Sequence, residues 1–202
     1  MDTQTTALHE VRLDHVTNLL VNSDARSVLD LGCGSGALLQ RLLESGAFSQ
    51  VAGLEPSGVS LRNARDRLAR WLDGDEPSVS LLRGSFQQPN EACAGFDAAA
   101  MVEVIEHVPP RELSGVEHAV FGCYRPRVLA MTTPNAEYNP LFDLAPGEFR
   151  DPDHRFEWSR DKFRQWVTGV ARRNGYRVRI GGIGEEDPEL GAPTHKAWFE
   201  KG

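Results

Sequence analysis

Hydrophobic and polar residues follow two different periods along this chain, one typical of strands and one typical of helices. Short apolar runs predict strands at residues 27–31, 51–54, 79–82, 96–102, 127–131, 176–180 and 197–199. Longer stretches with apolar positions three and four residues apart predict helices at residues 8–20, 37–44, 57–71, 111–123 and 161–174. This alternation predicts an α/β fold, a doubly wound and mainly parallel sheet with helices on both faces.

The end of the chain departs from the alternation. No convincing helix separates the last two predicted strands, so we expect an antiparallel hairpin at one edge of the sheet. Residues 136–158 are rich in proline, aspartate and aromatic residues, which is typical of an ordered functional loop. We see no linker or repeat, and we expect one domain that covers residues 1–202 and acts as a monomer.

Composition narrows the protein class. Hydrophobic residues make up 40% of the chain and charged residues 25%, as in globular proteins. The chain has no run of apolar residues that could span a membrane, and its N-terminus lacks a signal-peptide core, so we expect a cytoplasmic protein. The three widely spaced cysteines predict free thiols. The net charge of −7 argues against broad nucleic-acid binding, but residues 150–179 carry 9 basic and 4 acidic residues. The basic residues of this segment are consistent with contacts to a few phosphates. The alternative is that they lie on a solvent-exposed helix face.

A glycine-rich turn follows the first predicted strand. The stretch VLDLGCGSG, residues 28–36, places Asp30 before Gly32, Gly34 and Gly36, and a helix follows. Glycines let the backbone approach a ligand, and the helix N-terminus offers unpaired N–H groups. Glu55 ends the second strand, 19 residues after Gly36, where it can accept hydrogen bonds from a ribose diol. A structural turn and a nicotinamide enzyme are the alternatives, although the latter would prefer GxGxxG.

The order of these features resembles the S-adenosylmethionine (SAM) loop of class I methyltransferases. The resemblance implies that SAM is the cofactor. It also implies that Ser85 and Phe86, in the turn after the third strand, contact the adenine. Arg12, in the first predicted helix, could cover the SAM pocket.

Ionisable residues follow the fourth predicted strand. In VEVIEHV, residues 102–108, Glu103, Glu106 and His107 lie where the strand meets the ligand crevice of such a sheet. Charges there must be partnered, bound to a metal or engaged with a substrate. One helical turn could gather the three side chains, and they would form a plausible partial shell for a divalent cation. The alternatives are a surface or capping role for Glu106 and a base or packing role for His107.

Four motifs lie after the fourth predicted strand: EVIEHV at residues 103–108, TTPNAEYN at 132–139, DHRFEW at 153–158 and EEDPELGAPT at 185–194. Together they resemble the small-RNA 3′-terminal 2′-O-methyltransferases, the Hua-enhancer family of eukaryotes and its bacterial RNA-repair relatives. The resemblance covers residues 8–199. It implies that Glu103, Glu106, His107 and His154 hold Mn²⁺ or Mg²⁺ and are catalytic. It also implies methyl transfer from SAM to the 2′-hydroxyl of the last ribose of RNA.

The implied metal shell gives a reason for specificity toward the RNA 3′ end. Four protein ligands leave about two positions in a six-coordinate shell, and the free 2′ and 3′ hydroxyls of a terminal ribose fit them. Mixed nitrogen and oxygen ligands favour Mn²⁺ over Mg²⁺ and over Zn²⁺. The bacterial relatives usually have a further domain, so a polynucleotide kinase-phosphatase and ligase repair complex is a possible partner through a domain absent from this chain.

Residues of the long loop are candidates for RNA contact, because single-stranded ends are held by phosphate contacts and by stacking on aromatic or arginine side chains. The candidates are Asn135, Tyr138, Arg150, Arg155 and Arg160. The alternatives are a core position for Tyr138 and an ion pair of Arg155 with Asp153 or Glu157. For the whole chain, the competing function is a metal-independent O-methyltransferase of a small molecule.

Overall fold

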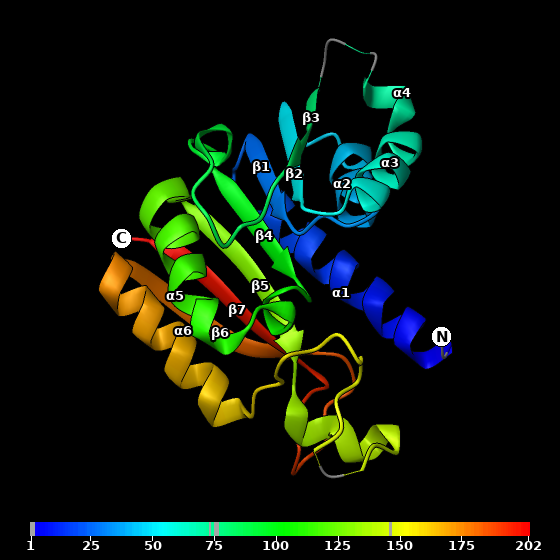
Figure 1. Ribbon diagram of the computed structural model, residues 1–202, viewed down its shortest axis with the longest axis vertical. Coiled ribbons are helices and arrows are strands. Elements are labelled where there is room, and N and C mark those ends of the chain that lie inside the picture. Colours follow the sequence, from blue (N-terminus) through cyan, green and yellow to red (C-terminus); the bar gives the residue numbers. More distant parts are fainter. Residues whose placement is uncertain (1–2, 73, 75–76, 146) are drawn as a thin grey trace.

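The computed structural model describes residues 3–72, 74, 77–145 and 147–202. Its centre is one seven-stranded sheet (Figure 1). The strands are β1 (Ser27–Leu31), β2 (Gln50–Glu55), β3 (Ser78–Arg83), β4 (Ala98–Val102), β5 (Val128–Pro134), β6 (Tyr176–Ile183) and β7 (Thr194–Lys201). They lie in the order β3-β2-β1-β4-β5-β7-β6. Strands β1 to β5 pair in parallel, and β7 is antiparallel to both β5 and β6. The predicted parallel sheet with a late antiparallel hairpin at its edge is confirmed.

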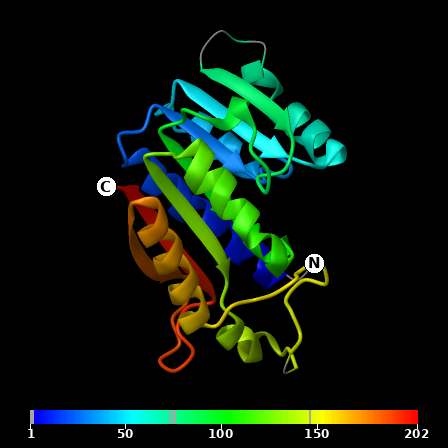
Figure 2. The ribbon, with the colours of Figure 1, turned by 60° about the vertical axis from the view of Figure 1, so that its left-hand side comes forward.

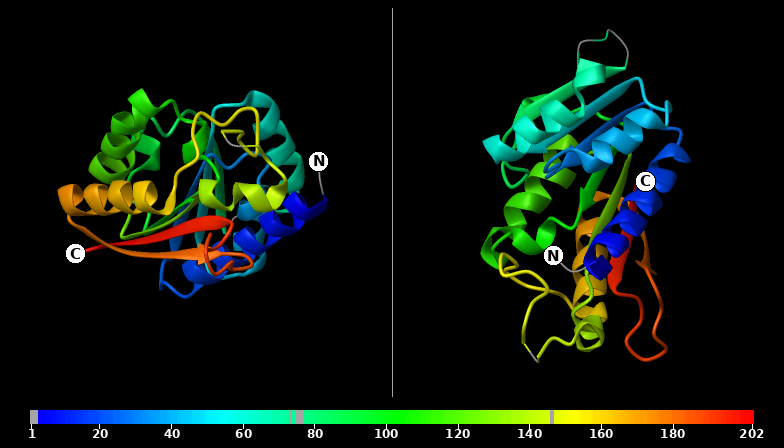
Figure 3. Two further views of the ribbon diagram at one scale, coloured as in Figure 1. Left: turned by 90° about the horizontal axis from the view of Figure 1, so that it is seen from below. Right: turned by 90° about the vertical axis from the view of Figure 1, so that its right-hand side faces the viewer.

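Helices cover both faces of the sheet (Figures 2 and 3). The helices of one face are α1 (Thr3–Val21), α2 (Ala37–Glu44), α3 (Gly58–Arg67) and α4 (Ala69–Leu72). The other face carries α5 (Leu113–Val116), the π-helical η4 (Glu117–Tyr124) and α6 (Arg160–Asn174). Successive strand residues such as Val28 and Leu29 enter opposite cores. Buried strands therefore read as continuous apolar runs.

Short 3₁₀ segments connect the larger elements: η1 (Glu91–Cys93), η2 (Ile105–His107), η3 (Pro110–Glu112) and η5 (Ala136–Phe142). The predicted helix at 57–71 is divided into α3 and α4 at Leu68, and the one at 111–123 is built from η3, α5 and η4. Strand β4 starts later than predicted, at Ala98. The carboxylate of Asp97 accepts hydrogen bonds from the backbone of Arg26 and Ser27, so the chain is anchored just before the strand.

One edge of the sheet gathers the segments that carry candidate chemistry. Strands β1, β2, β4 and β5 run in the same direction, so their carboxyl ends meet at this edge. Strand β7 runs the other way, and its first residue, Thr194, pairs with Pro134 at the end of β5. In the described part of the chain we find no helix with the length and apolarity needed to cross a membrane.

Candidate functional site

The glycine loop after β1 has a backbone that only glycine adopts easily. Gly32 has φ +83°, and a Cβ added there would lie 2.7 Å from Cγ1 of Val104. The loop is tied to β2, because the Gly32 N–H donates to the Leu54 carbonyl over 2.8 Å. Gly36 has φ +81° and caps the N-terminus of α2. The loop therefore packs closely against Val104, the residue that follows Glu103 after the end of β4.

Two buried acids lie beside the glycine loop. Glu55 accepts hydrogen bonds from the N–H groups of Gly34 (3.0 Å) and Ser57 (2.8 Å), so it shapes the turn while keeping further acceptor capacity. Burial first and the Glu55 carboxylate second raise the pKa of Asp30 to about 7. Two adjacent buried carboxylates without a cation are costly. This part of the site is therefore suited to a ligand with positive charge and hydroxyl groups.

The turn after β3 reaches the same loop. The Phe86 ring lies 3.5 Å from the position of an added Gly32 Cβ, and this side chain belongs to the core. Ser85 uses its hydroxyl to accept a hydrogen bond from the Gln87 N–H. The turn therefore lies beside the glycine loop, and the contact of Ser85 and Phe86 with adenine stays a prediction.

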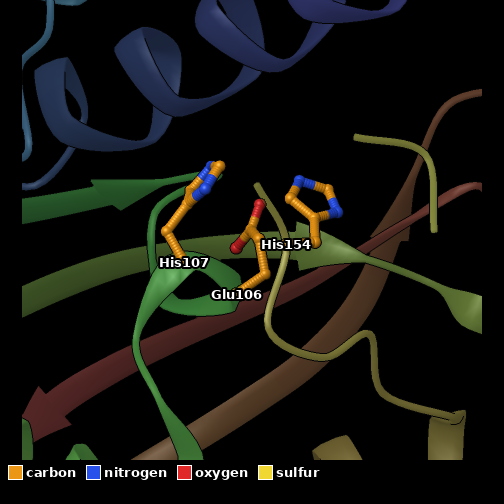
Figure 4. A group of neighbouring side chains, drawn as sticks. All are labelled: Glu106, His107 and His154. Carbon is orange, nitrogen blue, oxygen red and sulfur yellow. The ribbon is translucent and has the colours of Figure 1, made fainter. Parts of the chain in front are cut away.

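Glu106 and His107, in η2 after β4, come together with His154 of the long loop, and we call the three residues the Glu-His-His cluster. Each offers one ligand atom, and these atoms lie within 4.8 Å of one another. Figure 4 shows the Glu106 carboxylate between the two imidazoles. The ring centroids of the two histidines are 4.9 Å apart, and the rings are nearly perpendicular. A hydrogen bond of 2.8 Å from the Arg155 N–H to the Glu106 carbonyl ties the long loop to η2.

Glu106 is a fully buried acid with an incomplete set of partners. Oε2 accepts a hydrogen bond from the Thr133 hydroxyl over 2.9 Å, while Oε1 has no partner among the described residues. Burial first and the Glu103 carboxylate second raise the pKa of Glu106 well above its usual value. An unpartnered buried carboxylate oxygen is costly, and a cation would remove that cost. The carboxylate and the two imidazoles form a donor set that suits a divalent transition metal.

His154 is oriented by an acid that the sequence prediction missed. Its Nδ1 lies 2.6 Å from Oε1 of Glu157, so Nε2 is left as the ligand atom. Asn139 donates to the other oxygen of Glu157 over 2.6 Å. Burial acts to raise the pKa of Glu157, but the hydrogen bonds from His154, Asn139 and the Arg150 backbone outweigh it and lower the pKa. Such a carboxylate behind a histidine is typical of metal sites. The sequence signal that could have indicated this pair is the spacing of three residues between His154 and Glu157 in the motif DHRFEW.

Glu103 lies outside the Glu-His-His cluster. Its Oε2 is 3.1 Å from Nη2 of Arg12, and the Nε of Arg12 donates to the Thr194 hydroxyl over 2.8 Å. Its Oε1 is buried and has no partner among the described residues. Glu103 also has φ +54°, which is unusual for a residue with a Cβ. The structure thus brings together three of the four predicted ligands and shows Arg12 bound to the fourth.

Three of the residues predicted to contact RNA hold the long loop instead. The amide of Asn135 is fully buried and donates to the carbonyls of Leu190 and Ala192. Arg150 donates to Asn139 and to the Asn135 and Pro193 carbonyls. Tyr138 is buried and packs against Phe142. For these side chains the structure favours loop anchoring over contact with a substrate, because their polar groups or rings are already occupied or buried.

Arg155 and Arg160 differ from one another. Arg160 pairs with Glu137 and donates to the Glu189 carbonyl. Arg155 is exposed, and within the described ranges its side chain forms no hydrogen bond or ion pair. Of the predicted RNA contacts, Arg155 is therefore the one whose guanidinium stays available.

Comparisons with known proteins identify the family and the fold of the chain. A family model described as "Methyltransferase domain" matches residues 29–127. The small RNA 2′-O-methyltransferase of Xenopus tropicalis is 35% identical over 184 residues, which are 88% of this chain and 50% of that protein. The mouse enzyme of the same name is 34% identical, over 88% of this chain and 46% of that protein. The chain spans about half the length of these curated relatives.

Solved structures extend the likeness to the whole fold. The methyltransferase domain of bacterial CtHen1 is 40% identical with a TM-score of 0.86, over 96% of this chain and 99% of that chain. The small RNA methyltransferase HEN1 is 30% identical with a TM-score of 0.87, over 96% of this chain and 26% of that chain. The fold is that of class I SAM-dependent methyltransferases, and the chain belongs to the family of Hen1 methyltransferase domains.

Proposed function

We propose that this chain transfers a methyl group from SAM to the 2′-hydroxyl of the 3′-terminal ribose of RNA and requires a divalent cation. The names of the relatives support 2′-O-methylation of small RNA. The observation that carries the proposal is the Glu-His-His cluster, because it lies at the same edge of the sheet as the glycine loop. Association with an RNA-repair complex stays a prediction.

The residues around the glycine loop fit SAM. Gly32, Gly34 and Gly36 keep side chains out of the loop, and Glu55 retains acceptor capacity for a ribose diol. Asp30 is buried next to Glu55 and provides the negative charge that a ligand with a sulfonium and an ammonium group requires.

The residues of the cluster fit a metal ion. One carboxylate and two imidazoles provide mixed oxygen and nitrogen ligands, which favour Mn²⁺ over Mg²⁺. The unpartnered Oε1 of Glu103 makes this carboxylate the proposed fourth ligand. A bound divalent cation supplies charge that lowers the pKa of an adjacent hydroxyl. Thr133 orients Glu106 and Glu157 orients His154, so the ligands are held in place before any ion binds.

Glu157→Gln is expected to weaken Mn²⁺ binding about 10- to 100-fold, because the amide no longer holds the His154 ring as a charged acceptor does. Calorimetric titration with Mn²⁺ measures the effect. Asp153→Asn is the matched control, since it removes one negative charge from the exposed side of the same loop. Equal affinities of Glu157→Gln and the native protein would remove Glu157 from the site.

SAM binding is expected to weaken as the pH falls below about 7. In the free protein the pKa of Asp30 is about 7, so the group is neutral below that pH and must lose its proton to pair with a cation. Affinity should therefore fall by about tenfold per pH unit below 7 and level off above it. Titration calorimetry between pH 5.5 and 8.5 checks this, and Asp30→Asn should bind weakly with no such slope. A flat profile for the native protein would contradict the role of Asp30.

The terminal ribose provides the test of the proposed reaction. With labelled SAM and Mn²⁺, a short RNA with a free 3′ end should gain one methyl group and become resistant to periodate. The same RNA with a 3′-phosphate or a 2′-deoxy terminal sugar should gain none. Methylation of the 2′-deoxy RNA would overturn the assigned nucleophile. Methyl transfer to small phenols that is insensitive to chelator, with no transfer to RNA, would favour the competing small-molecule enzyme.

A further inference from the structure

A second hollow is lined by residues of the first half of α6 and of the β6–β7 hairpin. Figure 1 shows α6 alongside β6 and β7. The volume of the hollow is about 610 Å³, and we call it the α6 groove. Arg164 and Thr168 line it on the helix, Ile180 and Gly182 line it on the hairpin, and His195 lines it at the start of β7. Neither the glycine loop nor the Glu-His-His cluster contributes to this lining.

The α6 groove lies close to the Glu-His-His cluster. His195 pairs directly with Thr133 in the register of β7 and β5, so the two side chains project from the same face of the sheet. Thr133 is the residue that donates to Glu106. The innermost part of the groove is thus one strand away from the residue that holds the candidate metal ligand.

His195 lines the groove and carries a hydrogen-bond acceptor that no described residue uses. His195 is buried, with only 5% of its surface exposed. Its ring stacks on that of Phe163, and the ring centroids are 4.7 Å apart. Its Nε2 lies 3.0 Å from the Trp158 carbonyl, which can only accept, so Nε2 carries the proton. Burial, as the largest cause, lowers the pKa of His195 to about 4, which keeps the ring neutral. Nδ1 is then an acceptor, and it has no hydrogen bond within the described part of the chain.

The charged side chains that line the groove differ in whether they already have a partner in the fold. Arg160 is held by Glu137 and the Glu189 carbonyl. Arg164 is exposed and forms no ion pair or hydrogen bond with any described residue. Glu186 is the acid that lines the groove. A ligand would thus meet one available guanidinium, one carboxylate and one neutral acceptor.

We infer that the α6 groove binds a nucleotide of the RNA strand upstream of the reacting 3′ end. Arg164 contacts a phosphate, and Nδ1 of His195 accepts a hydrogen bond from a ribose hydroxyl or a base N–H. A nucleotide carries both a phosphate, which only accepts hydrogen bonds, and hydroxyl or N–H groups that donate them. The phosphate matches the guanidinium of Arg164, and the donors match Nδ1 of His195. This inference rests on the proposed function, because it assumes that RNA is the substrate.

The test measures binding of a single-stranded RNA of about twelve nucleotides by fluorescence anisotropy, with S-adenosylhomocysteine present. Arg164→Gln should weaken binding about fivefold and reduce the slope of log affinity against log salt by about 0.7, as expected for one lost phosphate contact. Glu186→Gln should tighten binding about twofold, because repulsion of the phosphate is removed. In methyl-transfer assays, Arg164→Gln should raise KM by a similar factor and leave kcat unchanged.

Arg172→Gln is the matched control, because Arg172 is exposed on the same helix but does not line the α6 groove. It should leave RNA affinity, the salt slope and KM close to the native values. Equal effects of Arg164→Gln and Arg172→Gln, or no effect of Arg164→Gln, would overturn the groove while methylation of RNA left the proposed function intact. A native protein that neither binds nor methylates RNA would overturn both.

Discussion

Glu106→Ala is expected to lose methyl transfer by at least about a thousandfold while SAM affinity stays unchanged. The fully buried carboxylate lies between two imidazoles, and one of its oxygens has no partner, so the residue contributes more to a metal site than to packing. SAM binding should persist, because the glycine loop and Glu55 keep their hydrogen bonds and Asp30 is not changed. Single-turnover rates with labelled SAM measure the first effect, and calorimetry measures the second.

One further variant of Glu106 separates the effect of charge from that of shape, and a variant of Glu112 is the control. Glu106→Gln keeps an acceptor for the Thr133 hydroxyl and should lose activity nearly as completely, because the anionic ligand is gone. Glu112→Ala removes a partly exposed acid six residues further along the chain and should remain active. Native turnover in Glu106→Ala would exclude Glu106 from the catalytic site.

Gly32→Ala is expected to reduce the free energy of unfolding by about 2–4 kcal/mol and to abolish tight SAM binding. A methyl group at this position adds the strain of a left-handed backbone to a contact of 2.7 Å with Val104. Because Val104 follows Glu103 directly, relief of that contact would also disturb the turn that holds the Glu-His-His cluster. Thermal unfolding and SAM titration measure the two effects.

Gly46→Ala is the control for backbone strain alone. Gly46 has φ +66°, and nothing lies within 4 Å of an added Cβ, so the expected cost is only about 1 kcal/mol. It lies in the turn after α2, and SAM binding should not change. Similar losses of stability in both variants would show that the contact between Gly32 and Val104 has little energetic weight.

The centre of the sheet could be predicted well because strands β1, β4 and β5 are buried on both faces. Apolar runs such as residues 27–31 stand out from the helical period, and β1 has the bounds that the sequence predicts. The hairpin could be predicted because no helical pattern separates β6 from β7. The division of the predicted helix at 57–71 could not, because its apolar spacing continues through Leu68.

Only part of the candidate site could be predicted from local patterns. Glu106 and His107 are adjacent and follow a strand, so their position could be expected from the fold. His154 required the resemblance to a family, because nothing local links a loop histidine to a residue 48 positions earlier. The ion pair between Arg12 and Glu103 joins α1 to the end of β4, and no sequence period reports such a distant contact.

Polar residues of the long loop illustrate a further limit. Asn135 and Arg150 have the side chains that RNA-binding proteins use, but here they satisfy backbone carbonyls inside the loop. A sequence reveals the donors that a segment carries, but it does not reveal whether folding uses them. Glu157 shows the converse, since the sequence offered Arg155 as its partner, whereas in the structure it orients His154, a proposed metal ligand.

Manganese dependence tests the central claim most directly. The native protein, freed of metal by chelator and dialysed, should bind one Mn²⁺ per chain in calorimetric titration, and methyl transfer to RNA should return with the same titration curve. His154→Ala should bind Mn²⁺ far more weakly. Full methyl transfer in the presence of excess chelator, with no Mn²⁺ binding by the native protein, would contradict the account.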